Sequence, residues 1–560
     1  MDQMNSESDV RIGHSLSEAE RQHLAQRRKT VLQCLKHLGI SCSEDKMPNI
    51  AVLGSGGGLR AMIGLLGSLC ELKKDGLLDC IMYLCGVSGS TWCMASLYKE
   101  LGWSTKLETV KENIVKRLAD GRVSFLKRGL KLTKYYSEKD NFSLTDVWAA
   151  LIVSHMVKEI DEHRLSEHRG NYTKDPYPIY TVIDKQCKYD KLNADPWFEI
   201  TPDESGYSLT GAFVDSSYLG SQFENGKKMS DQPETDMLYL QGLCGSALAD
   251  MEENLKYLYE ALKHLITDKI GSKEESHEPQ TPDVSSSSKV LLTLVELNLC
   301  VLRKEDPTVY LQAIKKLLKD GEAGQRTFSL VKRMTSEETI SKTELKDLNL
   351  QVCSSVNQTF EAQRFGDQFW PAIVKAIEKA THWNWGTTYD YLYKMNVEDV
   401  HSSVLDSEKR EYEDAGLLLN SPYFSVLRKE RDIDLIISLD YSAGNPFETV
   451  LRAAKTCKEL HIPFPEVVVP AEDREPQDFY VFRGHSKAPT VIHMPLFNAV
   501  NCKGEVQKWN NTYSTFQMSY CREMITALMK KAAENIKNNK HKLLKEIQNV
   551  IDGKKSSKLG

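Results

Sequence analysis

The stretch that decides the fold reads Asn49-Ile-Ala-Val-Leu53, Gly54-Ser-Gly-Gly-Gly58-Leu-Arg60, an apolar segment to about Lys74, Ile81-Met-Tyr-Leu-Cys85 and Gly86-Val-Ser88-Gly-Ser90. Short apolar runs that end in glycine-rich turns, each followed by a helix-like segment, predict a strand-helix-strand-helix unit. In open α/β sheets ligands bind at the carboxyl ends of the strands. We therefore expect the two turns to lie close together at a binding edge.

The residue types in these two turns point to acyl transfer. Consecutive glycines can turn their N–H groups toward an anion at the start of a helix. Ser88 stands between Gly86 and Gly89, which is typical of a sharp turn that exposes a nucleophilic hydroxyl. A nucleophile beside an oxyanion hole is what acyl transfer requires.

Each turn has another interpretation when it is taken alone. The glycine run matches a dinucleotide or Walker loop poorly, because Leu59 stands where a fingerprint counted from Gly54 needs glycine and no Gly-Lys-Ser/Thr follows. Gly-Val-Ser-Gly can also be an ordinary tight turn. Their occurrence on successive strand ends favours the catalytic interpretation.

Length, charge and cysteine content limit the classes of protein to which the chain can belong. The chain has 560 residues and a net charge of −6, so nothing in it suggests a nucleic-acid partner. The 13 cysteines show no zinc-site spacing, and an odd count without a signal peptide predicts a reducing, cytoplasmic compartment. No apolar run approaches the ~18 residues of a membrane span, so we expect any contact with lipid to be peripheral.

The pattern along the chain predicts one domain, 1–560, of three-layer α/β/α type with a central mixed sheet. Strand-helix rhythm returns near Tyr412 and Ile433, so both halves are expected to form one sheet. The interval 250–411 reads as a helical cap or lid insertion. Within it the polar segment 268–289 is expected to be disordered, because it cannot bury enough apolar area to offset its ordering entropy.

A basic helix is predicted at 522–552. Apolar residues recur along it at helical spacing, and lysines provide the charge that would attract an anionic bilayer. The alternative is that the apolar residues pack on the domain and the lysines are solvated.

Two routes exist for taking the proton from Ser88. In an α/β-hydrolase order, serine, acid and histidine form a triad, and His461, His485 or His493 could complete it after Asp414. In the other route a carboxylate bonds the serine hydroxyl directly. Asp414-Ala-Gly416 is the best candidate for such a dyad, although an aspartate before Ala-Gly is also common in ordinary turns.

At this point the chain resembles a known family. The segments Ser55-Gly-Gly-Gly58-Leu-Arg60-Ala-Met62, Gly86-Val-Ser88-Gly-Ser-Thr-Trp92 and Asp414-Ala-Gly416-Leu are similar to three signature segments of the cytosolic phospholipase A2 catalytic domain, a relative of the patatin lipases. Further matching blocks include Asp146-Val-Trp148, Pro176-Tyr-Pro178 and Leu435-Ile-Ile-Ser-Leu-Asp440. The resemblance extends from about residue 15 to 545.

The resemblance implies a role for each matching residue. Ser88 is the nucleophile and Asp414 the general base and acid, while Gly57 and Gly58 supply the oxyanion-hole amides. Arg60 and Arg431 match basic residues that face the substrate phosphate. The implied substrates are phospholipids and lysophospholipids at a membrane surface, and the implied activities are phospholipase A2, lysophospholipase and acyltransferase.

The departures from the family matter as well. Because fewer than fifty residues precede the predicted first strand, we expect the calcium-dependent lipid-binding module of most members to be absent, as it is in the gamma-type members. Because the implied mechanism needs no metal or other cofactor, we expect calcium-independent activity. The competing functions are an ordinary Ser-Asp-His esterase and a non-catalytic lipid-binding scaffold.

Overall fold

The computed structural model describes two compact units. The described residues are 8–171, 173–189, 196–246, 251–276, 282–318, 322–335, 340–361, 368–398, 400–470 and 475–556. The first unit comprises Met1–Gly121, Asp161–Ala249 and Thr388–Gly560, and the second comprises Arg122–Ile160 and Asp250–Thr387.

A mixed β-sheet forms the centre of the first unit, with strand order β1-β7-β6-β5-β4-β3-β2-β12-β14-β13 and with β10 and β11 off this path. The strands are β1 Val10–Ile12, β2 Ile50–Gly54, β3 Tyr83–Gly86, β4 Tyr177–Asp184, β5 Trp197–Ile200, β6 Glu204–Tyr207, β7 Ala212–Asp215, β10 Thr387–Tyr389, β11 Lys409–Asp414, β12 Leu435–Asp440, β13 Tyr480–Phe482 and β14 Thr490–Pro495. Gln222–Glu224 (β8) and Lys227–Ser230 (β9) form a separate hairpin. The central strands β4, β3, β2, β12 and β14 are parallel and buried, which explains why their sequences are nearly continuous apolar runs.

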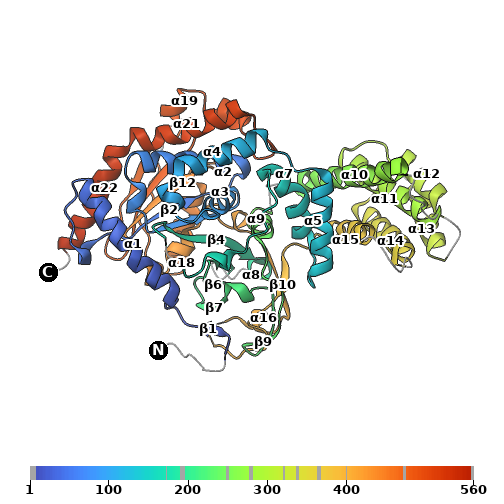
Figure 1. Cartoon of the computed structure of the whole chain (residues 1–560), viewed down its shortest axis with the longest axis horizontal. Helices are drawn as coiled ribbons and strands as arrows, with labels where there is room; N and C mark the ends of the chain where they lie inside the picture. Colours follow the sequence, from blue (N-terminus) through green and yellow to red (C-terminus); the bar gives the residue numbers. More distant parts are fainter. Residues whose placement is uncertain are drawn as a thin grey trace. The chain divides into compact units, whose positions relative to one another are not determined.

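Helices cover both faces of this sheet. They are α1 Glu18–His37, α2 Gly58–Lys74, α3 Gly89–Tyr98, α4 Leu107–Asp120, α8 Lys185–Tyr189, α9 Met237–Cys244, α16 Ser402–Leu405, α17 Tyr423–Val426, α18 Glu448–Glu459, α19 Ala499–Cys502, α20 Val506–Thr512, α21 Arg522–Asn538 and α22 Lys540–Ser556. Helix α2 follows β2 in the chain and leads to β3, which is the neighbour of β2 on one side. Helix α18 follows β12 and precedes β14, which is the neighbour of β12 on the opposite side. Since such crossovers are right-handed, α2 and α18 lie on opposite faces (Figure 1). The predicted three-layer fold is confirmed.

The direction of these connections also locates the binding edge. Strands β2 and β12 are parallel neighbours, and the chain leaves them toward opposite sides of the sheet. A crevice opens at the carboxyl ends of two strands where the order reverses in this way. The glycine-rich loop after Gly54 lies at this crevice.

The C-terminal segment is two helices, α21 and α22, rather than one. Its apolar residues, among them Leu528, Ile536, Leu543 and Ile547, are buried in the first unit. Helix α21 packs on α2. Of the two alternatives for this segment, packing on the domain is therefore the one observed.

The second unit is helical. Its helices are α5 Phe125–Glu138, α6 Leu144–Trp148, α7 Ser154–Val157, α10 Met251–Ser276, α11 Pro282–Leu302, α12 Thr308–Leu317, α13 Glu322–Met334, α14 Lys342–Glu361 and α15 Phe369–His382, with a π-helical stretch at Ala149–Val153. The predicted insertion 250–411 begins where the second segment of this unit begins, but its extent differs from that of the unit in two ways. The segment 122–160 also belongs to the unit, because the apolar stripe of α5 packs on α10 and α15, whereas 388–411 belongs to the first unit.

Helix α11 differs from two expectations based on composition: that the segment 268–289 is disordered, and that no apolar run approaches the length of a membrane span. The segment 268–289 is helical through Ser276 and again from Pro282, and 277–281 lies outside the described residues. Apolar residues such as Leu291 and Leu294 continue the helical pattern of α11 and are buried. Their packing stabilises the helix and so offsets the entropy cost of ordering its polar residues. The 19 residues Val284–Leu302 are long and apolar enough to cross a membrane by length and composition, but 61% of that stretch is buried inside the protein.

The contact between α2 and α21 yields a first prediction. A Cβ atom on Gly67 of α2 would lie 2.6 Å from the carbonyl oxygen of Met529, which is rigid helix backbone. Gly67→Ala should therefore push the helices apart and lower the free energy of unfolding by about 1 to 3 kcal/mol in urea titrations. Gly553 in α22 has open space around it, so Gly553→Ala should keep or raise stability by up to about 1 kcal/mol. Equal changes in unfolding free energy for the two substitutions would contradict the close approach of α2 and α21.

Candidate functional site

The loop after β2 brings two amide donors to the edge of the sheet. Gly57 and Gly58 have φ angles of 152° and 59°, and a Cβ atom on Gly57 would lie 2.7 Å from the carbonyl oxygen of Tyr441. Only glycine suits this conformation. Both residues stand at the N-terminus of α2, where amides have no intrahelical acceptor, and neither N–H donates to another described residue. The loop can therefore bind an oxyanion.

Ser88 occupies a strained turn between β3 and α3. Its φ and ψ are 50° and −122°, a conformation that non-glycine residues rarely adopt and that costs about 1 to 3 kcal/mol. A Cβ atom on the next residue, Gly89, would overlap the carbonyl oxygen of Gly58. The serine turn thus rests directly against the glycine loop, as the sequence predicted.

Strand β4 brings Asp414 to the same place. Residue Tyr180 of β4 pairs with Gly86 of β3, and Val182 pairs with Asp414 of β11. Both β3 and β11 lie on the edge of β4 opposite β5, because Tyr180 and Val182 also pair with β5. The two strands run in opposite directions along one edge, and their ends stand two residues, or about 7 Å, apart along β4.

Hydrogen bonds hold Asp414 in position. Its backbone N–H donates to the Ser246 hydroxyl at 3.0 Å, and its Oδ1 accepts from the Gly416 N–H at 2.8 Å. The side chain is buried, with 1% exposure for the residue. These two hydrogen bonds therefore help to orient the carboxylate.

One cavity of about 370 Å³ joins these groups. The residues that line it are Gly56, Gly57, Gly58, Arg60, Ser88, Asp414, Gly416, Leu417, Leu419, Asn420, Ser442, Ala443, Gly444, Asn445, Glu448, Thr449, Arg452 and Thr515. Five of the six residues predicted for the site thus lie around a common space, and the sixth, Arg431, does not.

Arg60 contributes a buried positive charge to the wall of the cavity. Its Nε donates to the Tyr441 carbonyl at 2.7 Å and its Nη1 to the Tyr513 carbonyl at 2.6 Å. These acceptors are neutral, and no ion pair joins Arg60 to a carboxylate among the described residues. Burial lowers the pKa of the Arg60 guanidinium, and an anion in the cavity would offset that cost.

Arg431 does not line this cavity, so the predicted contact of Arg431 with the substrate phosphate is wrong. Its guanidinium is fully buried and forms ion pairs with Glu20 of α1 and Glu199 of β5, at 2.9 and 2.8 Å. Arg431 precedes β12, which runs parallel to β3. It therefore stands at the opposite end of the parallel strands from Ser88, which follows β3.

None of the three candidate histidines lines the cavity in the described part of the chain. His493 is buried in β14, where its Nε2 lies 2.6 Å from the Pro446 carbonyl oxygen, and burial lowers its pKa. His461 and His485 lie in exposed turns. The geometry favours the dyad over the triad.

Sequence reasoning missed two residues of this site. The Asn420 side chain donates from Nδ2 to the Gly56 carbonyl at 3.2 Å and to the Ser442 hydroxyl at 2.7 Å, so it joins the glycine loop to the segment after β12. Ser246 orients the backbone of Asp414. Asn420 has no local sequence signal, and Ser246 lies in a short block, Gly245-Ser-Ala247, that resembles the family but indicates no role.

Among the described residues, no group of three histidine, cysteine, aspartate or glutamate side chains is placed to hold a metal ion. The donor set of the cavity is instead made of hydroxyl, carboxylate, amide and guanidinium groups. This set suits acyl transfer to and from a serine.

Comparisons with known proteins identify the family of this chain. A family profile described as "Lysophospholipase catalytic domain" matches residues 50–276. The chain is 33% identical to human cytosolic phospholipase A2 gamma, over 97% of this chain and 96% of that protein. It is 34% identical to the mouse cytosolic phospholipase A2 gamma, over 98% of this chain and 93% of that protein.

Similarity extends to other relatives and to a solved structure. Mouse cytosolic phospholipase A2 zeta is 30% identical over 88% of this chain and 54% of that protein. The structure of "Human GIVD cytosolic phospholipase A2" superposes with a TM-score of 0.65 at 21% identity, covering 98% of this chain and 69% of that one. The latter likeness shows the fold.

The placement of Arg431 yields a second prediction. Burial alone would raise the pKa of Glu199, but Arg431 and Arg428 outweigh it and lower that pKa to about 2. This carboxylate therefore stabilises the fold above its ordinary pKa of 4.5, and the contribution is lost as pH falls toward 2. Arg431→Gln should cost about 3 to 5 kcal/mol of unfolding free energy at pH 7, and the deficit should shrink at pH 4.

The control is Arg21→Gln, since Arg21 forms only an exposed ion pair with Glu18 on α1. It should change stability by less than about 1 kcal/mol. Urea titrations at both pH values would measure these effects. A stable Arg431→Gln protein with a raised KM for phospholipid would contradict the structural role and restore the substrate role.

Proposed function

Because this chain belongs to the cytosolic phospholipase A2 family and is a phospholipid-hydrolysing esterase, we propose that Ser88 and Asp414 carry its reaction as a dyad. The observation that supports the proposal is the single cavity lined by the serine, the aspartate and two unbonded glycine amides. The substrate is the fatty acyl ester of a glycerophospholipid or lysophospholipid.

In the first half of the proposed reaction, the Ser88 hydroxyl attacks the ester carbonyl carbon and its proton passes to Asp414. The carbonyl oxygen becomes an oxyanion that the Gly57 and Gly58 amides stabilise; such donors contribute about 3 kcal/mol each. When the tetrahedral intermediate collapses, the ester C–O bond breaks. Asp414 returns the proton to the leaving oxygen, so the alcohol departs neutral and the acyl group stays on Ser88.

In the second half, water attacks the acyl-serine while Asp414 takes its proton, and Ser88 leaves with that proton restored. The products are a fatty acid and free enzyme. If the hydroxyl of a lysophospholipid replaces water, the same intermediate gives transacylation. One cavity would thus support phospholipase A2, lysophospholipase and acyltransferase activities.

An aspartate is a weak base for a serine hydroxyl, because its ordinary pKa is about 3.9. Two features of the site reduce this deficit. Ser88 caps the N-terminus of α3, where the helix dipole favours negative charge. The glycine amides then stabilise the charge that develops on the substrate oxygen.

We propose that Arg60 binds the substrate phosphate or reinforces the oxyanion hole from beside Gly57. Its charge is buried, lines the cavity and is bonded to carbonyl groups rather than to carboxylates. We also propose that turnover needs no calcium, because each step is assigned to a group of the chain itself.

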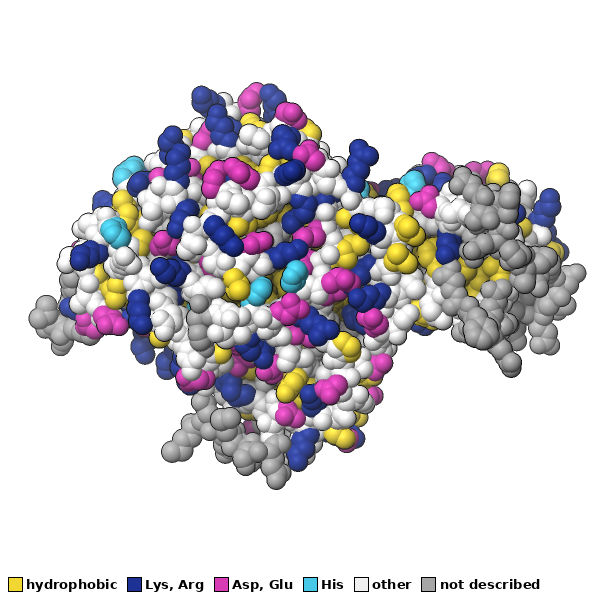
Figure 2. Space-filling view, in the orientation of Figure 1, with side chains coloured by type: hydrophobic (Ala, Val, Ile, Leu, Met, Phe, Trp, Pro, Cys, Tyr) yellow, Lys and Arg dark blue, Asp and Glu magenta, His cyan; other side chains and the backbone are white. Residues whose placement is uncertain are grey.

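Peripheral membrane contact of a cytosolic enzyme is part of this proposal, and helix α5 offers a surface for it. Leu126 and Leu130, one turn apart, are 72% and 61% exposed, and Lys127 lies between them. Figure 2 shows hydrophobic side chains at the surface near this helix, with lysine and arginine around them. Exposed leucines beside lysines suit the headgroup region of an anionic bilayer.

The alternatives are a Ser-Asp-His esterase and a lipid-binding scaffold without catalysis. The esterase requires an imidazole beside Ser88, and no histidine lines the cavity among the described residues. A scaffold would have no need of the strained φ angle of Ser88. Both observations favour the dyad.

The proposal predicts the outcome of a direct assay. With phospholipid labelled at each acyl position and a calcium chelator present, the unmodified chain should release labelled fatty acid. Ser88→Ala and Asp414→Asn should each lower kcat by at least about 10³-fold. The matched control Asp432→Asn, at an exposed turn, should keep full activity.

Substitutions of the three candidate histidines test the alternative Ser-Asp-His triad. His461→Ala, His485→Ala and His493→Gln should retain turnover per folded molecule. Loss of activity in one folded histidine variant, together with normal activity of Asp414→Asn, would overturn the dyad in favour of a triad. Dependence on calcium would contradict the metal-free mechanism only.

The membrane surface is tested separately by liposome flotation. Leu126→Ser with Leu130→Ser should weaken binding to anionic vesicles by about tenfold or more, since each leucine contributes about 1.5 kcal/mol on burial. Val309 in α12 is equally exposed, at 71%, so Val309→Ser is the matched control and should bind normally. Equal binding by both variants would remove α5 from the proposal.

A further inference from the structure

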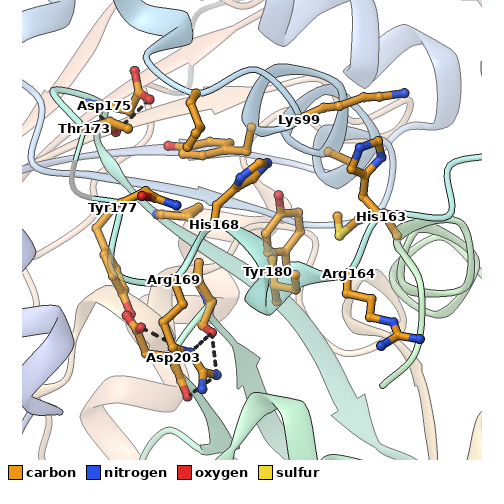
Figure 3. Close-up of a pocket in the computed structure, with 18 of the residues that line it drawn as sticks. Lys99, His163, Arg164, His168, Arg169, Thr173, Asp175, Tyr177, Tyr180 and Asp203 are labelled. Atoms are coloured by element: carbon orange, nitrogen blue, oxygen red, sulfur yellow. Dashed lines mark hydrogen bonds and ion pairs between the residues drawn. The ribbon is translucent and has the colours of Figure 1, made fainter. Parts of the chain in front are cut away.

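A second cavity (Figure 3) lies at the C-terminal end of helix α3, whereas Ser88 precedes the N-terminus of that helix. Tyr98 ends α3 and Met237 begins α9, and both line this cavity of about 90 Å³. The whole of α3, about 15 Å long at 1.5 Å per residue, separates it from Ser88. It is therefore distinct from the catalytic cavity.

An unbonded hydroxyl group lies inside this second cavity. Tyr180 is 1% exposed, and its hydroxyl has no hydrogen-bond partner among the described residues. Figure 3 shows the Tyr180 ring standing in the middle of the lining residues. Leaving a buried hydroxyl without a partner costs about 1 to 3 kcal/mol, so a ligand that bonds it recovers this free energy.

His168 offers a second unsatisfied group to the same space. Its Nε2 is buried and has no hydrogen-bond partner in the described part of the chain. An imidazole nitrogen donates or accepts according to its tautomer, and a phenol does both. Burial raises the pKa of Tyr180, so its hydroxyl keeps its proton. The two groups together suit a ligand atom that accepts one hydrogen bond and donates another.

The carboxylates around the cavity are already satisfied. Asp161 accepts from the His163 Nδ1 at 2.8 Å. Asp175 accepts from the backbone amides of Gly102 and Ser104, and Asp203 accepts from the Tyr177 hydroxyl at 2.8 Å. No acidic side chain of the lining is thus left to bind a cation.

The basic side chains balance these acids. Lys99, Arg164 and Arg169 line the cavity with the three aspartates, and Arg169 forms ion pairs with Asp203 and Asp215. A charged ligand would add an uncompensated charge to a balanced and partly desolvated site, which is costly. The balance of charge favours a neutral ligand.

Part of the remaining wall is apolar, and the space is small. Ala95, Leu101, Leu165, Pro178 and Met237 contribute to it. At about 10 to 15 Å³ for each water-sized sphere, the cavity of about 90 Å³ holds roughly six to nine non-hydrogen atoms. This room suits a short alkyl chain with one polar group.

From these observations we propose that the second cavity binds an uncharged amphiphile that carries a hydroxyl group. The ligand hydroxyl lies between Tyr180 and His168, accepting a hydrogen bond from one and donating to the other. Its alkyl part lies against the apolar wall. The site is independent of the chemistry at Ser88.

The test uses thermal unfolding of the full chain with three six-carbon probes: 1-hexanol, hexanoate and hexylammonium. Hexanol at millimolar concentration should raise Tm in a saturable manner, and the two ions should have at least tenfold weaker effects. Tyr180→Phe should leave the Tm of the free protein unchanged or higher, because it removes an unsatisfied polar atom. It should weaken hexanol binding by about tenfold or more, the equivalent of about 1.4 kcal/mol.

Tyr98→Phe is the matched control. The Tyr98 hydroxyl lines the same cavity but donates to the Pro176 carbonyl at 2.7 Å, so its loss should lower Tm and leave the hexanol effect intact. The proposal is overturned if Tyr180→Phe keeps the full hexanol effect, if the ions bind as tightly as the alcohol, or if none of the probes raises Tm. It is also overturned if Tyr180→Phe destabilises the free protein as much as Tyr98→Phe.

Discussion

One edge of strand β4 governs the geometry at the catalytic end of the sheet. Strands β3 and β11 meet along that edge from opposite directions, with Gly86 opposite Tyr180 and Asp414 opposite Val182. Ladder hydrogen bonds fix this register, and a slip of one residue would turn the Asp414 side chain to the other face of the sheet. The spacing between serine and aspartate is thus set by backbone pairing, although 326 positions of sequence, from 88 to 414, separate them.

Local chemistry made half of the site predictable. The glycine run and the Gly-Val-Ser-Gly turn each follow an apolar strand, so the rule that strand ends bind ligands was enough to join them. Asp414 was already the best candidate for a carboxylate base, but a triad with a histidine stayed open until the family resemblance favoured the dyad, because residue spacing says nothing about a partner that arrives from another strand. The roles of Asn420 and Ser246 become visible only through their hydrogen bonds.

Arg431 illustrates a different error, in which a role was carried over from the family resemblance without regard to the end of the sheet at which the residue lies. It follows Asp414 by few residues, yet α17 and the turn after it carry the chain to the other end of the sheet before β12 begins. The parallel direction of β12 could have revealed this, since a residue that precedes a parallel strand lies away from the carboxyl edge. Composition misjudged the helical unit because the segment 268–289 was judged apart from the helices to which it belongs. Val284 is buried within that segment, and α11 continues beyond it through buried residues such as Leu291 and Leu294.

The two ends of the sheet depend on one another. At one end, Arg431 joins Glu20 of α1 to Glu199 of β5, and the Tyr83 hydroxyl of β3 donates to the same Glu20 at 2.8 Å. Since β3 is only four residues long, this network anchors the start of the strand whose other end carries the serine turn. A displacement of β3 would move Ser88 away from Gly58 and from the end of β11 together. The buried ion pairs therefore serve the proposed chemistry at a distance, by holding the strand on which the nucleophile depends.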